Sequence, residues 1–161
     1  MLRRALAETG PRAYAIAFAA ALLLAVPDLG RQLLVRDDPS RLHALLVDVV
    51  GVLSAAAVQL ALVGLLNGRQ HWLRHGTGIV LDALRIRPRT LLLGLVAAGA
   101  VSAVLTLPVS VAALGAGQVL GPLRDPSLGA LLVAQASDVV ATAVTAAWFA
   151  VFAGLCAQRT P

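Results

Sequence analysis

Three apolar runs, each long enough to cross a lipid bilayer, constrain this chain more than any other feature. They occupy about residues 43–66, 91–114 and 128–157, and they contain only two acidic residues, Asp48 and Asp138. Crossing roughly 30 Å of hydrocarbon takes about 20 predominantly apolar residues in a helix. A soluble chain of 161 residues could not hide these runs, because a domain of that size buries only about two thirds of its unfolded surface. We therefore expect an integral membrane protein.

A fourth span is predicted over about residues 11–35. Its first part is uninterrupted and apolar, but Pro27, Asp28 and Arg31 follow, so the last third is expected to be polar or broken at Pro27. An alternative makes residues 1–26 a cleaved signal peptide with an arginine-containing start. No convincing small-x-small cleavage site precedes Pro27, so a retained span is the favoured interpretation.

The connections between the expected spans are short and rich in turn residues. They read RDDPSRL at 36–42 and GAGQVLGPLRDPS at 115–127. Short connections favour antiparallel neighbours. The predicted fold is therefore all-α, a single transmembrane domain over residues 1–161 arranged as a four-transmembrane-helix up-down bundle.

Arginine supplies all of the basic charge and is unevenly distributed. Cytoplasmic loops of membrane proteins carry the excess of basic residues, so the side with nine arginines is predicted to be cytoplasmic. Both termini and residues 67–90 then lie inside. The lysine-free, alanine- and leucine-rich composition suggests a GC-rich bacterial genome, hence a bacterial cytoplasmic membrane. The nine are Arg3, Arg4, Arg12, Arg69, Arg74, Arg85, Arg87, Arg89 and Arg159, against Arg31, Arg36, Arg41 and Arg124 on the other side.

The stretch between the second and third spans is predicted to contain a short basic amphipathic helix. Thr77 suits an N-cap and Pro88 a stop, which predicts a helix over about 78–87. Such a helix fits the inner surface of a membrane with its arginines near anionic lipid headgroups, although control of topology alone would also explain the charge. The arginines adjoin apolar spans, so a nucleic-acid partner is not expected. The predicted lipid-contact residues are Arg69, Trp72, Arg74, Arg85, Arg87 and Arg89.

Polar residues inside the spans form the candidate functional site. An ionisable residue within a span costs about 2.5–3.5 kcal/mol on insertion scales, so it is a functional hypothesis by default. Helical spacing aligns Asp48, Gly51, Ala55 and Gln59 on the second span, Asp138, Thr142 and Thr145 on the fourth, and Ser102, Thr106 and Ser110 on the third. Such stripes are expected to face the bundle interior, either as a binding cavity or simply holding helices together. The candidate site comprises His43, Asp48, Gln59, Gln135, Asp138 and Thr142.

Enzyme signatures are weak in this chain. His71 and His75 have the spacing of two ligands on one helix face, but no glutamate accompanies them and Arg74 lies between, so no metal or cofactor is predicted. DDPSR at 37–41 begins like the aspartate-rich magnesium motif of prenyl-transfer enzymes, with Arg41 where the third acid would stand. Catalysis is therefore not the favoured function, and no catalytic residue is predicted.

One stretch resembles a known family. VQLALVGLLNGR, a short basic amphipathic segment ending in DALRIRPRTLLLGL and a new span are similar in hydropathy and loop pattern to the bacterial glycerophosphodiester-phosphodiesterase membrane-domain superfamily, over roughly residues 50–110. The resemblance implies a non-catalytic membrane module. The expected function is an accessory or interaction protein, a subunit supporting a larger transport or biosynthetic system through a membrane partner or homo-oligomer. The alternatives are a small oligomeric transporter or binder of lipid or apolar metabolite, and a membrane enzyme acting on an apolar substrate.

Overall fold

The structure is a computed structural model that describes residues 1–37, 41–68, 71–115 and 127–158. For residues 28, 31–37, 41–45, 47 and 48 the description covers the backbone alone. The predictions made for Arg69, Arg124 and Arg159 lie outside the described residues, and so do those for the side chains of His43 and Asp48.

The described part of the chain is all-helical and contains no strand. Three helices include segments long and apolar enough to cross a membrane: Val49–Leu66, Pro88–Leu114 and Leu128–Ala157. Leu2–Glu8 and Pro11–Pro27 would together make a fourth candidate, bent by 89° at the break between them. The helices are α1 (Leu2–Glu8), α2 (Pro11–Asp37), α3 (Arg41–Leu66), α4 (Trp72–Ile86), α5 (Pro88–Leu114) and α7 (Leu128–Ala157).

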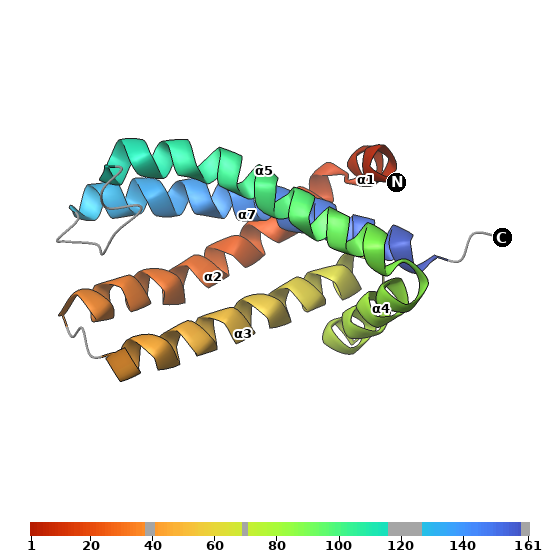
Figure 1. Ribbon diagram of the computed structural model, residues 1–161, viewed down its shortest axis with the longest axis horizontal. Coiled ribbons are helices and arrows are strands. Elements are labelled where there is room, and N and C mark those ends of the chain that lie inside the picture. The colour runs from red at the N-terminus through yellow and green to blue at the C-terminus, as the bar shows by residue number, and fades with distance from the viewer. Residues whose placement is uncertain (38–40, 69–70, 116–126, 159–161) are drawn as a thin grey trace.

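Helix α7 is central among the described helices and packs against each of the other five (Figure 1). Of its apolar stretch, 67% is buried inside the protein, against 17% for the corresponding stretches of α3 and α5. Many of the buried residues of α7 are small, namely six alanines and Gly154, which let neighbouring helices approach on several sides. The exposed faces of α3 and α5 carry many valines and leucines, as expected of surfaces that contact lipid.

Helix α2 packs on α7 through a row of alanines at every fourth position. Ala13, Ala17 and Ala21 are all buried, and Ala21 joins Val139 and Ala143 of α7 in a small apolar cluster. Residues four apart lie on one face of a helix, so this row gives α2 a narrow, smooth contact surface. Because these alanines are small, side chains of α3 also fit beside the interface between α2 and α7.

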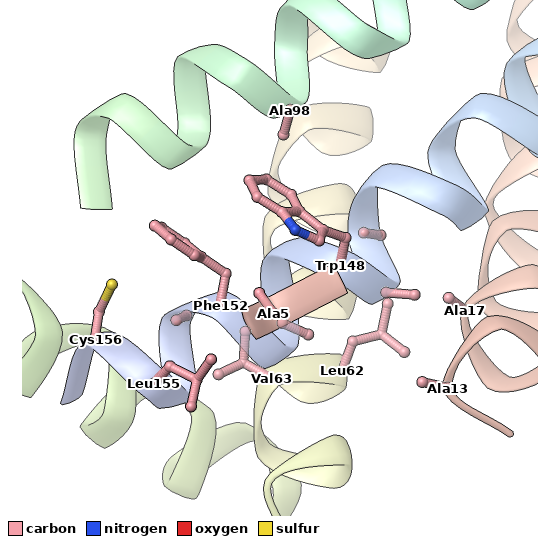
Figure 2. Packing of buried hydrophobic residues seen from close by; sticks show 14 of the residues in the cluster. Ala5, Ala13, Ala17, Leu62, Val63, Ala98, Trp148, Phe152, Leu155 and Cys156 are labelled. Atoms are coloured by element: carbon pink, nitrogen blue, oxygen red, sulfur yellow. The ribbon is translucent and has the colours of Figure 1, made fainter. Parts of the chain in front are cut away.

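On another side of α7, aromatic rings pack against α5. The rings of Trp148 and Phe152 stack with their centroids 5.1 Å apart, and Figure 2 shows them beside Ala98 of α5. Phe152 lies against Gly94, where an added Cβ would collide with the ring. Glycine at this position therefore lets a large ring fill the seam between α5 and α7. The Trp148 indole nitrogen is buried with no hydrogen-bond partner among the described residues.

A close helix crossing holds α4 against α3. A Cβ at Gly64 would collide with the backbone of Trp72, and a Cβ at Gly76 with the backbone of Leu60, so the two helices touch through glycines. Asn67, in the turn after α3, donates from Nδ2 to the Val63 carbonyl at 2.8 Å and to the Ala150 carbonyl of α7 at 2.9 Å. These two hydrogen bonds join the turn after α3 both to α3 and to the central helix α7.

Helices α1 and α4 lie at the same end of the molecule as the N-terminus and the last turn of α7 (Figure 1). Both are foreshortened in this view, because they run across the direction of the long helices. The start of α2, the end of α3, the start of α5 and the end of α7 are also at this end. The arginine-rich segments of the sequence therefore meet at one end of the bundle.

Several helix boundaries differ from the sequence-based expectation. Helix α4 begins at Trp72 rather than near residue 78, and Thr77 is no N-cap: its hydroxyl donates to the Leu73 carbonyl within the helix at 2.8 Å. Helix α2 continues through Pro27 without a break. Helix α1 was not predicted at all. By contrast, α7 has the bounds expected for the fourth apolar run.

Candidate functional site

A groove runs between α2, α3 and α7, and we call it the α2–α3–α7 groove. It consists of two adjoining cavities of about 430 and 300 Å³ that share Ala21, Leu24, Ala55 and Thr142 in their walls. No described residue of α5 lines either cavity. The remaining wall residues are Pro27, Ala25, Val50, Gly51, Val52, Ser54, Gln135, Asp138 and Val139 in the larger cavity, and Ala17, Ala20, Ala56, Val58, Gln59, Leu62 and Ala146 in the smaller.

The polar side chains of the groove come from α7 and α3. Gln135, Asp138 and Thr142 stand three and four positions apart on α7, so helical geometry places them on one face. Gln59 approaches from α3 and donates from Nε2 to the Ala146 carbonyl at 3.4 Å, a long hydrogen bond. Amide, hydroxyl and carboxylate groups therefore line one continuous, otherwise apolar space.

The polar groups lie deep along the helices. Asp138 is ten residues from Leu128, the first residue of α7, which corresponds to about 15 Å of helix. Thr142 is near the midpoint of the same helix. In a bilayer, a carboxylate at this depth is costly unless polar groups surround it. Asp138 is exposed at the groove, and the half-buried Gln135 and Thr142 line the same cavity.

Small residues leave the space that the groove occupies. On α3, Gly51 and Ala55 stand four apart and both line the larger cavity, as does Ser54. On α2 the same cavity is bounded by Ala21 and Ala25. The periodic stripe of Gly51, Ala55 and Gln59 expected on the second span does face the groove.

The structure thus places four of the six candidate residues along the groove: Gln135 and Asp138 in the larger cavity, Gln59 in the smaller one, and Thr142 in both. The backbones of His43 and Asp48 lie in α3, but their side chains are outside the described set. The polar stripe expected on the third span does not reach the groove. Thr106 instead donates to the Ser102 carbonyl within α5 at 3.0 Å.

The described candidate lipid-contact residues lie on and beside α4, at the opposite end of the bundle from the larger cavity. Arg74, Arg85 and Arg89 are exposed, and Trp72 is 54% exposed. Arg87 joins α4 to α5, is half-buried, and donates from Nη1 to the sulfur of Met1 at 3.1 Å. Sequence reasoning missed the contribution of α1, whose seven residues carry no periodic signal of their own.

Comparison with known proteins gives no relative: no family model, no curated protein and no solved structure matches this chain. The resemblance to the glycerophosphodiester-phosphodiesterase membrane-domain superfamily stays a prediction from hydropathy and loop pattern. Within the described residues, no group of three or more His, Cys, Asp or Glu side chains is placed to hold a metal ion. The α2–α3–α7 groove and the basic end of the bundle are therefore the features of the molecule that bear on its function.

Proposed function

We propose that this chain is a bacterial cytoplasmic-membrane protein of four spans in up-down order, with both termini in the cytoplasm. In this proposal α2, α3, α5 and α7 cross the bilayer, and α1 and α4 lie in its inner interface. Support comes from the three apolar helices, from the 89° bend that separates α1 from α2, and from the arginines gathered beside α1 and α4. The exposed valines and leucines of α5 then face lipid rather than water.

We further infer that the α2–α3–α7 groove binds an amphiphilic small molecule. The observation that carries this proposal is that polar side chains line a groove whose walls are otherwise mostly alanine, leucine and valine. Asp138 lines the larger cavity, Gln59 the smaller one, and Thr142 both. Ligand sites are typically concave, mostly apolar spaces of about 300–1,000 Å³ with a few convergent polar groups. An ionised carboxylate only accepts hydrogen bonds, so the ligand's head group is expected to donate them, as an alcohol or an amine does.

Binding of this kind suits a membrane protein that carries, senses or presents an apolar metabolite. It therefore favours a transporter or binder of lipid or apolar metabolite over an accessory subunit and over a membrane enzyme. The expected role as an accessory subunit of a larger transport or biosynthetic system stays a prediction, since it concerns a partner chain.

A photoactivatable alkanol tests the groove directly. The protein is reconstituted in nanodiscs, labelled with a medium-chain alkanol bearing a diazirine, digested and mapped by mass spectrometry. We expect label on groove residues of α2, α3 and α7, displaced by excess unlabelled alkanol. Filling the groove with Ala55→Leu should reduce this label several-fold, because Ala55 lines both cavities.

The matched control is Ala57→Leu, which is on the same helix and exposed but lines neither cavity. It should leave the labelling unchanged. Asp138→Asn should lower displaceable label without lowering protein abundance, since the amide keeps the shape and removes the charge. Equal labelling of the Ala55→Leu and Ala57→Leu variants, or label spread evenly over the lipid-facing side of α5, would contradict a ligand site.

A further inference from the structure

The basic end of the bundle presents two short helices whose exposed faces are amphipathic. On α4, Gly76 and Ala83 are buried against the rest of the protein. Beside this buried strip, Leu73 and Leu84 are 50% and 40% exposed. At 100° per residue, Arg74 and Arg85 lie about 100° further round the helix from these two leucines. Helix α4 therefore has three sectors: a protein contact, an exposed apolar flank and a basic face.

Helix α1 repeats this arrangement on a smaller scale. Ala5 is fully buried, whereas Leu2 and Leu6, on the adjoining flank, are 49% and 58% exposed. Arg3 and Arg4 lie on the remaining side, where Arg4 pairs with Glu8 at 2.6 Å. The hydroxyl of Thr9 donates to the Ala5 carbonyl at 2.7 Å, just before the chain turns into α2. Two helices far apart in sequence thus carry the same division of faces at one end of the molecule (Figure 1).

We propose that α1 and α4 together form a docking surface for an anionic phospholipid bilayer surface, with their exposed leucines in the acyl boundary and their arginines on the lipid phosphates. This inference rests on the orientation proposed above, and it adds a preference for anionic over zwitterionic lipid. Helices that lie in the interface have this combination of a basic face and an apolar face.

The positive charge of this end of the bundle favours an anionic bilayer surface over an uncharged one. The exposed side chains of α1, α4 and the first turn of α5 include Arg3, Arg74, Arg85 and Arg89, against the acidic Asp82 and the paired Glu8. Anionic lipid attracts basic side chains within about a Debye length of the surface, roughly 8–10 Å at ordinary salt concentrations. Trp72, more than half exposed at the start of α4, suits the headgroup zone and also provides a probe.

Quenching of Trp72 by brominated lipids measures the preference. The full chain is reconstituted in phosphatidylcholine vesicles containing a small fraction of either brominated phosphatidylglycerol or brominated phosphatidylcholine. The chain has two tryptophans, and Trp148 is buried, so a Trp72→Phe variant supplies the background. We expect brominated phosphatidylglycerol to quench Trp72 several-fold more effectively at equal mole fraction, and we expect added salt to reduce the difference.

Two triple variants, each of which removes three positive charges, test whether the arginines of α4 and α5 cause the lipid preference. R74Q/R85Q/R89Q should bring the ratio of the two quenching efficiencies close to one. R31Q/R36Q/R41Q, which removes three arginines from the end of α2 and the start of α3, should leave the ratio of the parent protein. A parent ratio of one, or a preference that survives R74Q/R85Q/R89Q, would overturn the proposal.

The contribution of α1 is measured with Leu6→Trp in the Trp72→Phe background. Its quenching should also favour the anionic lipid, and R3Q/R4Q should lower that preference. In the protein that retains Trp72 and Leu6, R3Q/R4Q should leave the lipid preference measured at Trp72 unchanged. No quenching of either probe by any brominated lipid would place both helices away from the membrane surface and contradict the docking surface. The alkanol labelling of the groove does not depend on this result, so the two proposals fail separately.

Discussion

The contact between Asn67 and Gly154 provides an energetic test of how the α3–α4 hairpin packs on α7. The side chain of Asn67 fills the space that the missing side chain of Gly154 leaves. The Asn67 side chain lies where a Cβ at Gly154 would be, and its Cγ would be 2.6 Å from that Cβ. Gly154→Ala therefore forces Asn67 to rotate and to give up its hydrogen bonds to Val63 and Ala150. We expect this single substitution to loosen the α3–α4 hairpin from α7.

The magnitude follows from two contributions to the free energy of unfolding. Two side-chain hydrogen bonds inside a membrane protein are worth about 0.6 kcal/mol each, or about 1 kcal/mol together. An extra methyl group in a packed interface costs about 1–3 kcal/mol. Gly154→Ala should therefore destabilise by about 2–4 kcal/mol, and Asn67→Ala, which only removes the bonds, by about 1 kcal/mol.

The double variant distinguishes this account from simple additivity. With Asn67 shortened to alanine, the new methyl at position 154 enters vacated space, so Asn67→Ala/Gly154→Ala should cost only about 1–2 kcal/mol. That is less than Gly154→Ala alone, a coupling typical of residues in direct contact. The assay is SDS-induced unfolding of the reconstituted protein followed by circular dichroism.

Gly99→Ala is the matched control, because a Cβ at Gly99 would meet nothing within 4 Å. It should change the free energy of unfolding by less than about 0.5 kcal/mol. A neutral Gly154→Ala, or a double variant whose cost equals the sum of the two singles, would refute the steric reasoning.

Three further substitutions follow from the packing around α7, each read out in the same unfolding assay. Phe152→Ala should cost about 3–5 kcal/mol, since the ring is buried against Gly94 and leaves a cavity. Trp148→Phe should cost less than about 1.5 kcal/mol despite the burial of Trp148, because its indole N–H has no partner among the described residues to lose. Ser127→Ala should cost about 1 kcal/mol, because the Ser127 hydroxyl caps α7 by accepting from the Ala130 amide at 3.2 Å.

Hydropathy located the long helices because apolar length is a property of the sequence alone. The fourth apolar run and α7 agree at both ends, Leu128 and Ala157. Boundaries near prolines and short helices were harder to place. Pro88 was interpreted as a stop for the preceding helix, but it is also the first residue of α5, where its missing N–H is tolerated. Helix α1 has only seven residues, too few for a periodic pattern to stand out.

Periodicity also showed which polar residues share a helix face, but it could not show which faces meet. Gly51, Ala55 and Gln59 do face α7 across the groove, whereas Ser102, Thr106 and Ser110 belong to a helix that contributes nothing to the groove. The difference depends on glycines and alanines elsewhere. Gly94 brings α5 onto the Phe152 side of α7, which leaves the Thr142 side to α2 and α3. Such pairwise fits between helices have no signature in a single sequence.

The location of the N-terminus tests the central claim most directly, because it separates four membrane crossings from three. An epitope tag before Met1 is probed with protease in intact spheroplasts and in inverted vesicles, alongside reporter fusions after Arg74, near Pro39 and after Pro161. Four spans predict a tag protected in spheroplasts and digested in inverted vesicles, with Arg74 and Pro161 inside and Pro39 outside. A tag digested in intact spheroplasts, a tag lost by cleavage, or an outside signal at Pro161 would contradict the account.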